Sequence, residues 1–248
     1  MLTTGIVSVT FRKLSVGEVA SVSKKAALGA IEWGGDIHVP PMNEEAIRTA
    51  KCASDENGLK IASYGSYFNC TGDDEEMEKN LSTAAALGAP NIRIWAGKLW
   101  SNDYTPQTRT DFIKRIRHTV QCAAKHGLTV SPEFHQGTLT DELDSALRLV
   151  DEVGEDNFRL YWQPNQFKDD EYNLRAIKGV LPYLSNVHVF SWHESDMYPL
   201  VWGEKMWRQY LDVIRSDGKD HNLLLEFVCD GTVDQLYRDA ETLHGWLR

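Results

Sequence analysis

The sequence predicts an α/β protein folded as a (β/α)8 or TIM barrel in a single domain of 248 residues. Eight short strand-like segments alternate with longer segments that have helical patterns, and a glycine often stands between a helix and the next strand. No linker, low-complexity tract or charge block interrupts the alternation. Eight such units in a chain of about 250 residues match a closed barrel better than an open sheet.

The expected strands and helices follow from this alternation and from the residues that begin and end helices. The predicted strands are 5–11, 30–33, 60–64, 91–96, 129–134, 158–162, 186–192 and 223–228. Ser15 and Glu18 have the spacing of a capping box at a helix start, and Thr140 precedes an acidic first turn. Six glycines are expected to end helices in the left-handed conformation: Gly29, Gly58, Gly88, Gly127, Gly154 and Gly218.

The composition of the chain argues against several classes of function. A formal net charge of −10 works against binding of nucleic acid or of an anionic membrane surface. No apolar run approaches the length of about 18 residues that a membrane span needs, and the first residues do not form a signal peptide. The four cysteines (Cys52, Cys70, Cys122 and Cys229) are widely spaced, which favours reduced thiols and a cytoplasmic location. The sequence leaves open the possibility that the protein forms a homo-oligomer.

The predicted strand 129–134 is the most informative stretch. Its alternation places Ser131, Glu133 and His135 on one face, with Glu133 and His135 at the carboxyl end. Both faces of a barrel strand are covered, so a carboxylate and an imidazole there are costly unless something binds them. The active face of such a barrel lies at the carboxyl ends of its strands. This strand therefore predicts a functional site.

Three further strand ends carry comparable residues. Glu133, Gln163, His188 and Glu226 lie on the predicted fifth to eighth strands, and together they form a nitrogen and oxygen ligand set. Such a set suits one divalent metal ion, namely Mn²⁺, Co²⁺ or Zn²⁺. The alternatives are that His188 is a hydrogen-bonded core residue and that Glu226, within an apolar run, pairs with Arg93.

Several stretches resemble one known family. They are 7–14, 31–40, 63–67, 92–97, the triplets that begin at Glu133 and His188, and Tyr198-Pro-Leu with Gly203 and Trp207. Together they look like the sugar phosphate isomerase/epimerase group of the xylose isomerase-like TIM barrels. The resemblance implies one divalent metal held by Glu, Asp, His and Glu, which carries over to Glu133, His188 and Glu226. Gln163 stands where the family has Asp.

The resemblance also implies a metal-dependent epimerase or isomerase that acts on a sugar or sugar phosphate. A divalent ion chelated by a carbonyl and a neighbouring hydroxyl acidifies the C–H bond between them. Glu133 and Glu226 would then move the proton. Carboxylates on opposite faces invert the carbon, whereas one carboxylate on a single face gives aldose–ketose isomerisation. We favour epimerisation.

Substrate contacts are predicted from aromatic and polar residues near the strand ends. Aromatic faces pack against the C–H faces of sugars, although core packing is the alternative for each tryptophan, and a solvated loop is the alternative for the polar residues. The candidates are Trp33, Asp36, His38, Trp95, His135, Trp162 and Trp192. Arg12 or Lys98 is the candidate for holding a phosphate.

Two other classes share the predicted barrel. A barrel that has lost catalysis would bind a sugar or a protein partner, and Gln163 would be the trace of that loss. An apurinic-site endonuclease-like metallohydrolase would use about three metals and many more His and Asp ligands than this chain offers. Its DNA substrate also conflicts with the acidic charge.

Overall fold

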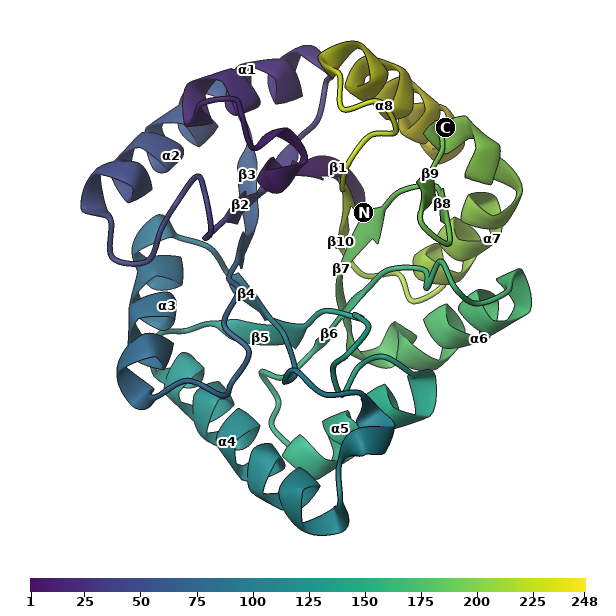
Figure 1. The fold of residues 1–248 in the computed structure, drawn as a ribbon. Helices are drawn as coiled ribbons and strands as arrows, with labels where there is room; N and C mark the ends of the chain where they lie inside the picture. The colour runs from purple at the N-terminus through teal and green to yellow at the C-terminus, as the bar shows by residue number, and fades with distance from the viewer.

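Eight parallel strands surround a central axis, and eight helices cover them from outside (Figure 1). The computed structural model describes residues 1–248. The barrel strands are β1 (Leu2–Val7), β2 (Ala30–Gly34), β3 (Lys60–Gly65), β4 (Asn91–Ile94), β5 (Thr129–Pro132), β6 (Leu160–Trp162), β7 (Leu184–Val189) and β10 (His221–Leu225). The helices are α1 (Val16–Lys25), α2 (Glu44–Asn57), α3 (Asp74–Leu87), α4 (Pro106–Lys125), α5 (Leu143–Val153), α6 (Asp170–Val180), α7 (Glu204–Arg215) and α8 (Val233–Leu247).

The strands follow the order β5-β4-β3-β2-β1-β10-β7-β6 and pair in parallel. Two isolated parallel bridges, Val130 with Phe158 and Glu133 with Tyr161, link β5 to the β6 side. These bridges join the two ends of the sheet, so the predicted (β/α)8 barrel is confirmed. None of the helices combines the length and apolar composition that crossing a membrane requires.

Five strands end earlier than predicted, namely β1, β4, β5, β7 and β10. β1 stops at Val7 because Ser8–Phe11 forms the 3-10 helix η1, where the Ser8 hydroxyl accepts a hydrogen bond from the amide of Gly34 at 2.8 Å. β7 stops at Val189. Trp192 instead lies in a small antiparallel hairpin of β8 (Trp192–His193) and β9 (Asp196–Met197), outside the barrel sheet.

Helix ends follow most of the predicted signals. Ser15 and Glu18 form the predicted capping box. Five of the six glycines have a positive φ, but Gly29 does not, because Ala27 takes the left-handed conformation at the end of α1 with φ of 54°. Thr140 does not cap α5. Its hydroxyl donates to the backbone carbonyl of Glu133, and the helix begins later, after Glu142.

Buried apolar side chains form two clusters. The larger contains 59 residues from both strands and helices and fills the layer between them. The smaller contains six residues, none from an α-helix, and therefore occupies the barrel interior: Val7, Val9, Ala30, Ala62, Tyr161 and Leu224. All four cysteines are free thiols.

The strands next to Gly5 pack so closely that they leave no space for a side chain at this position. A Cβ atom at Gly5 would lie 2.4 Å from the Ala30 carbonyl oxygen and 2.5 Å from Leu224 Cδ2. We expect Gly5→Ala to lower the free energy of unfolding by about 1–3 kcal/mol, since backbone cannot yield easily. Gly17→Ala in α1 is the control, because its Cβ meets nothing within 4 Å and should add about 0.5 kcal/mol. Urea unfolding measures both; equal stability of the two variants would contradict this packing.

Candidate active site

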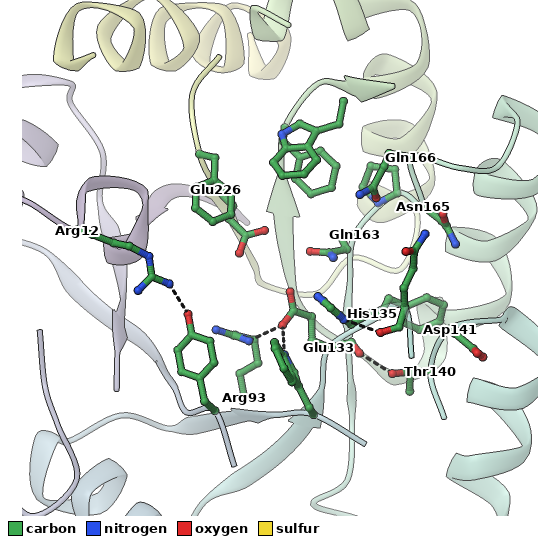
Figure 2. Close-up of a pocket in the computed structure, with 18 residues that line it drawn as sticks. Arg12, Arg93, Glu133, His135, Thr140, Asp141, Gln163, Asn165, Gln166 and Glu226 are labelled. Carbon is green, nitrogen blue, oxygen red and sulfur yellow. Dashed lines mark hydrogen bonds and ion pairs between the residues drawn. The ribbon is translucent and has the colours of Figure 1, made fainter. Parts of the chain in front are cut away.

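A pocket of about 280 Å³ opens at the carboxyl ends of the barrel strands. Figure 2 shows the side chains that line it, which come from loops and strand ends far apart in the sequence. They include Arg12, Trp95, Glu133, His135, Gln163 and Glu226. The pocket therefore lies where the active face of a TIM barrel is expected.

Of the four predicted ligands, Glu133, Gln163 and Glu226 line this pocket, and His188 lies fully buried against them. The Nδ1 atom of His188 lies 2.8 Å from Gln163 Oε1, 3.3 Å from Glu133 Oε1 and 3.1 Å from Glu226 Oε2. One ligand atom from each of Glu133, His188 and Glu226 lies within 4.8 Å of the others. All three of these residues are buried. The strand ends converge as the sequence predicts.

These separations suit a divalent ion. Ligand atoms about 2.1 Å from a metal and at right angles to one another lie about 3 Å apart. The three distances from His188 Nδ1 are close to that value. One imidazole nitrogen with carboxylate and amide oxygens is also the mixed set that borderline divalent ions accept. The residues present therefore fit a metal ion.

Arg93 and Glu32 lie directly behind the ligands. Arg93 is 2% exposed, donates from Nε to Glu32 Oε1 at 2.8 Å, and donates from Nη1 to Glu133 Oε2. Trp95 Nε1 donates to the same Glu133 oxygen at 2.9 Å. Arg93 thus forms its ion pairs with Glu32 and Glu133, whereas the sequence alternative paired it with Glu226.

Sequence reasoning missed Glu32 as a site residue. Its signal was present, because Glu32 interrupts the apolar run Ala30-Ile-Glu-Trp33 in the same way that Glu226 interrupts its own strand. The family resemblance implies metal ligands on the fifth to eighth strands. Glu32 lies on the second strand, and its side chain is fully buried.

Charge in this region is unevenly balanced. Burial is the largest single effect on Glu32 and would raise its pKa, but Arg93 and His188 together outweigh burial and lower that pKa to about 2. Burial also opposes ionisation of Glu133, yet Arg93 and His188 hold its pKa well below the ordinary value. Once His188 is neutral, as binding of a metal at Nδ1 requires, the carboxylates of Glu32, Glu133 and Glu226 face one guanidinium, which leaves two negative charges in excess. A divalent cation would neutralise them.

The pocket contains part of the predicted substrate set. Trp95, His135 and Trp192 line it, and the His135 ring stacks on Trp95 with ring centroids 4.6 Å apart. Arg12 lines the pocket mouth and pairs with Asp36, which is not itself in the lining. Lys98 is exposed outside the pocket.

Three predicted substrate contacts lie away from the pocket. Trp33 Nε1 donates a hydrogen bond to the Ser54 hydroxyl of α2 at 3.0 Å. The Trp162 ring packs edge-on against the Tyr210 ring of α7, with ring centroids 5.2 Å apart. Both tryptophans alternate with an inward residue, so they face the helices. His38 is held by the Ser8 hydroxyl and the Leu14 carbonyl. We therefore leave these three residues out of the substrate site.

The fold and the converging side chains together define a barrel with a group of residues that could hold a metal ion at the carboxyl ends of its strands. Residues 21–248 match the sequence model of the xylose isomerase-like TIM barrel family, so the chain belongs to that family. The resemblance inferred from sequence is confirmed.

Named relatives include a dehydratase and epimerases. The 3-dehydroshikimate dehydratase of Bacillus anthracis is 26% identical over 227 residues, which cover 81% of this chain and 80% of that protein. The solved structure of a probable 3-DHS dehydratase of petrobactin synthesis, also from Bacillus anthracis, superposes with a TM-score of 0.79 at 20% identity and covers 98% of this chain and 99% of that one. D-psicose 3-epimerase with D-tagatose, from Clostridium cellulolyticum H10, gives 0.74 at 13% identity with 98% and 97% covered. At these identities the structures show a shared fold.

Metal content tests the ligand assignment. Purified protein incubated with Mn²⁺ and dialysed should keep about one ion per chain, because the site offers one set of converging ligands. The double variant Glu226→Gln, His188→Ala should keep none by elemental analysis. His193→Ala, which removes an exposed imidazole, is the control and should bind as the wild type does. Equal metal in the double variant would show that the ligands are assigned wrongly.

Gln163 provides a second test. Gln163→Asp adds a negative charge beside His188 Nδ1, so Mn²⁺ should bind about tenfold more tightly or better. Gln166→Asp is the matched control, since Gln166 lines the same pocket without a hydrogen bond to His188. Isothermal titration measures both dissociation constants. Unchanged or weaker binding in Gln163→Asp alone would contradict the place of Gln163 in the ligand set.

Proposed function

We propose that the protein is a metal-dependent enzyme that removes a proton from the carbon next to the carbonyl of a small hydroxyketone. The observation that carries this proposal is the convergence of Glu133, Gln163, His188 and Glu226 at the floor of a pocket. A bound divalent ion would polarise the substrate carbonyl and hydroxyl and so acidify the C–H bond between them. The proton transfers then fall to side chains of this chain.

Glu226 is the carboxylate best placed to accept that proton. It lines the pocket and its ion pair is with His188. Glu133 was expected to share the task, but one of its oxygens accepts hydrogen bonds from both Arg93 and Trp95, and its pKa is lowered mainly by Arg93 against the effect of burial. A carboxylate held in this way is a weaker base. We assign Glu133 to holding the metal and Glu226 to proton transfer.

His135 is our second proton-transfer group. Its Nδ1 atom lies 2.8 Å from the backbone carbonyl of Gln136, which can only accept a hydrogen bond. The proton of the neutral ring therefore resides on Nδ1, and Nε2 keeps a free lone pair. Stacking on Trp95 holds the ring in the pocket wall. A neutral imidazole in this position can accept a proton at Nε2 and pass it on.

Two reactions share this first proton removal. Return of the proton to the other face of the carbon gives epimerisation, which the sequence resemblance favours. Loss of a hydroxyl from the next carbon, with a proton donated to it, gives dehydration, and the dehydratase relative at 26% identity supports that outcome. Glu226 would remove the proton in either case, and His135, once protonated at Nε2 by solvent, would donate that proton to carbon or to the departing oxygen.

The pocket suggests a small polar substrate. The side chains of Gln136, Gln163, Asn165 and Gln166 supply amide groups, while Trp95 and Trp192 supply aromatic surface. Arg12 at the mouth offers a guanidinium to a phosphate or carboxylate. Ketoses, ketose phosphates and 3-dehydroshikimate are all hydroxyketones of suitable size.

The rival functions differ in what the site must contain. An apurinic-site endonuclease-like cluster needs several metals, but the structure contains one group of three or more His, Cys, Asp and Glu residues that could hold an ion. A barrel that has lost catalysis predicts binding without turnover, so an activity panel separates it from the proposed enzyme.

Hydrogen exchange tests the proposed reaction. With Mn²⁺ in D₂O, epimerisation of D-psicose or D-tagatose should introduce deuterium at the proton-transfer carbon, as observed by NMR, whereas dehydration of 3-dehydroshikimate should release that hydrogen to the solvent. A new ketose epimer indicates epimerisation, whereas an aromatic product indicates dehydration. Glu226→Gln should lower kcat at least ~10²-fold because the proton acceptor is lost. Glu194→Gln, an exposed carboxylate of a surface hairpin, is the control.

Two results would contradict this proposal. One is turnover with the original hydrogen fully retained, which would indicate hydride transfer between carbons. The other is binding of these ketones without turnover or exchange, which would favour a barrel that has lost catalysis.

A further inference from the structure

Glu32 has an environment that a simple structural ion pair does not require. Its side chain is fully buried in the barrel, and its Oε1 atom accepts from Arg93 Nε at 2.8 Å. The same Oε1 atom lies 3.9 Å from His188 Nε2, and Oε2 has no hydrogen-bond partner. Glu32 thus stands between the guanidinium that holds Glu133 and the ring of His188.

The first connection passes through Arg93. Its guanidinium joins Glu32 on one side to Glu133 on the other. With Oε2 of Glu133 held by Arg93 and Trp95, the Oε1 atom is directed at His188 Nδ1. Glu32 therefore fixes, through Arg93, which oxygen Glu133 presents to the ligand set. Its negative charge also offsets the guanidinium, which would otherwise repel a cation.

The second connection concerns the proton of the His188 ring. Nδ1 faces the three ligand oxygens, whereas Nε2 is buried without a hydrogen-bond partner. A metal held at Nδ1 takes that lone pair, so the proton of the neutral ring must reside on Nε2. Glu32 Oε1 is the carboxylate that faces Nε2. A carboxylate behind a metal-bound imidazole stabilises this tautomer and orients the ring.

We infer that Glu32 is a positioning residue for the metal site. It orients Glu133 through Arg93, and in the metal-bound protein it accepts a hydrogen bond from Nε2 of His188. The inference rests on the metal-dependent function proposed above. Glu32 touches no substrate. Its effect is on metal affinity and, through it, on activity.

Replacements of Glu32 and Arg93 should act in opposite directions. Glu32→Gln leaves the guanidinium uncompensated and removes the charged acceptor for His188, so Mn²⁺ should bind about 10–100-fold more weakly. Arg93→Gln removes a positive charge beside Glu133 while Trp95 Nε1 still holds the Oε2 atom of Glu133, so Mn²⁺ should bind more tightly. If the pair served only to stabilise the fold, both variants would lose affinity together or neither would change.

The experiment is isothermal titration of the metal-free full-length protein with Mn²⁺. It compares the wild type, Glu32→Gln, Arg93→Gln, the double variant and Glu32→Asp. The double variant restores the charge balance and should recover part of the affinity lost in Glu32→Gln. Glu32→Asp keeps the charge and should lose less affinity than Glu32→Gln, and it serves as the test if Glu32→Gln does not fold by circular dichroism. Asp239→Asn, a buried carboxylate that accepts from Leu200 and Gln235, is the control for loss of a buried charge outside the site.

The outcomes separate this inference from the proposed function. Wild-type protein without Mn²⁺ affinity would overturn the metal-dependent function and this inference with it. Wild-type affinity retained in folded Glu32→Gln, or in Glu32→Asp if the former does not fold, would overturn the role of Glu32 alone. Weaker binding in both Glu32→Gln and Arg93→Gln would also overturn it. Manganese electron paramagnetic resonance of the loaded variants should show an altered spectrum in Glu32→Gln and an unchanged one in Asp239→Asn.

Discussion

The burial of three carboxylates at one end of the barrel is the constraint on which the site depends. Glu32, Glu133 and Glu226 come from β2, the end of β5 and the end of β10, and each is at most 8% exposed. Ionised carboxylates out of water cost several kcal/mol each unless charge and hydrogen bonds compensate them. Arg93 compensates part of this charge. The remaining negative charge would favour a cation at this end of the barrel, in line with the metal site that we propose.

Gln163 changes this balance relative to the family pattern. An Asp in its place would add a fourth carboxylate beside His188 Nδ1, whereas the amide contributes an oxygen without charge. The chain thus keeps the geometry of the ligand set but gives up part of its attraction for a metal. A less neutralised ion withdraws electrons more strongly from a bound carbonyl, so weaker capture and stronger activation would accompany one another.

Hydrophobic periodicity and the residues at helix starts and ends were sufficient to predict the barrel, because each βα unit repeats the same local signals. The same reasoning found Glu226, since a carboxylate within Leu223-Leu-Leu-Glu-Phe-Val228 must have a partner. It left Trp33 and Trp162 between substrate contact and core packing, because an alternating strand does not show by itself which face looks inward. Glu32 was missed for a related reason. Its partners Arg93 and His188 lie 61 and 156 positions away and come together only when the barrel closes.

The most direct measurement is anomalous X-ray diffraction from crystals soaked with Mn²⁺. Our account predicts one peak about 2 Å from His188 Nδ1, with Glu133 Oε1 and Glu226 as further ligands. It also predicts His188 Nε2 within hydrogen-bonding distance of Glu32. A peak elsewhere in the pocket, coordination through Nε2 of His188, or no peak with saturating Mn²⁺ would contradict it.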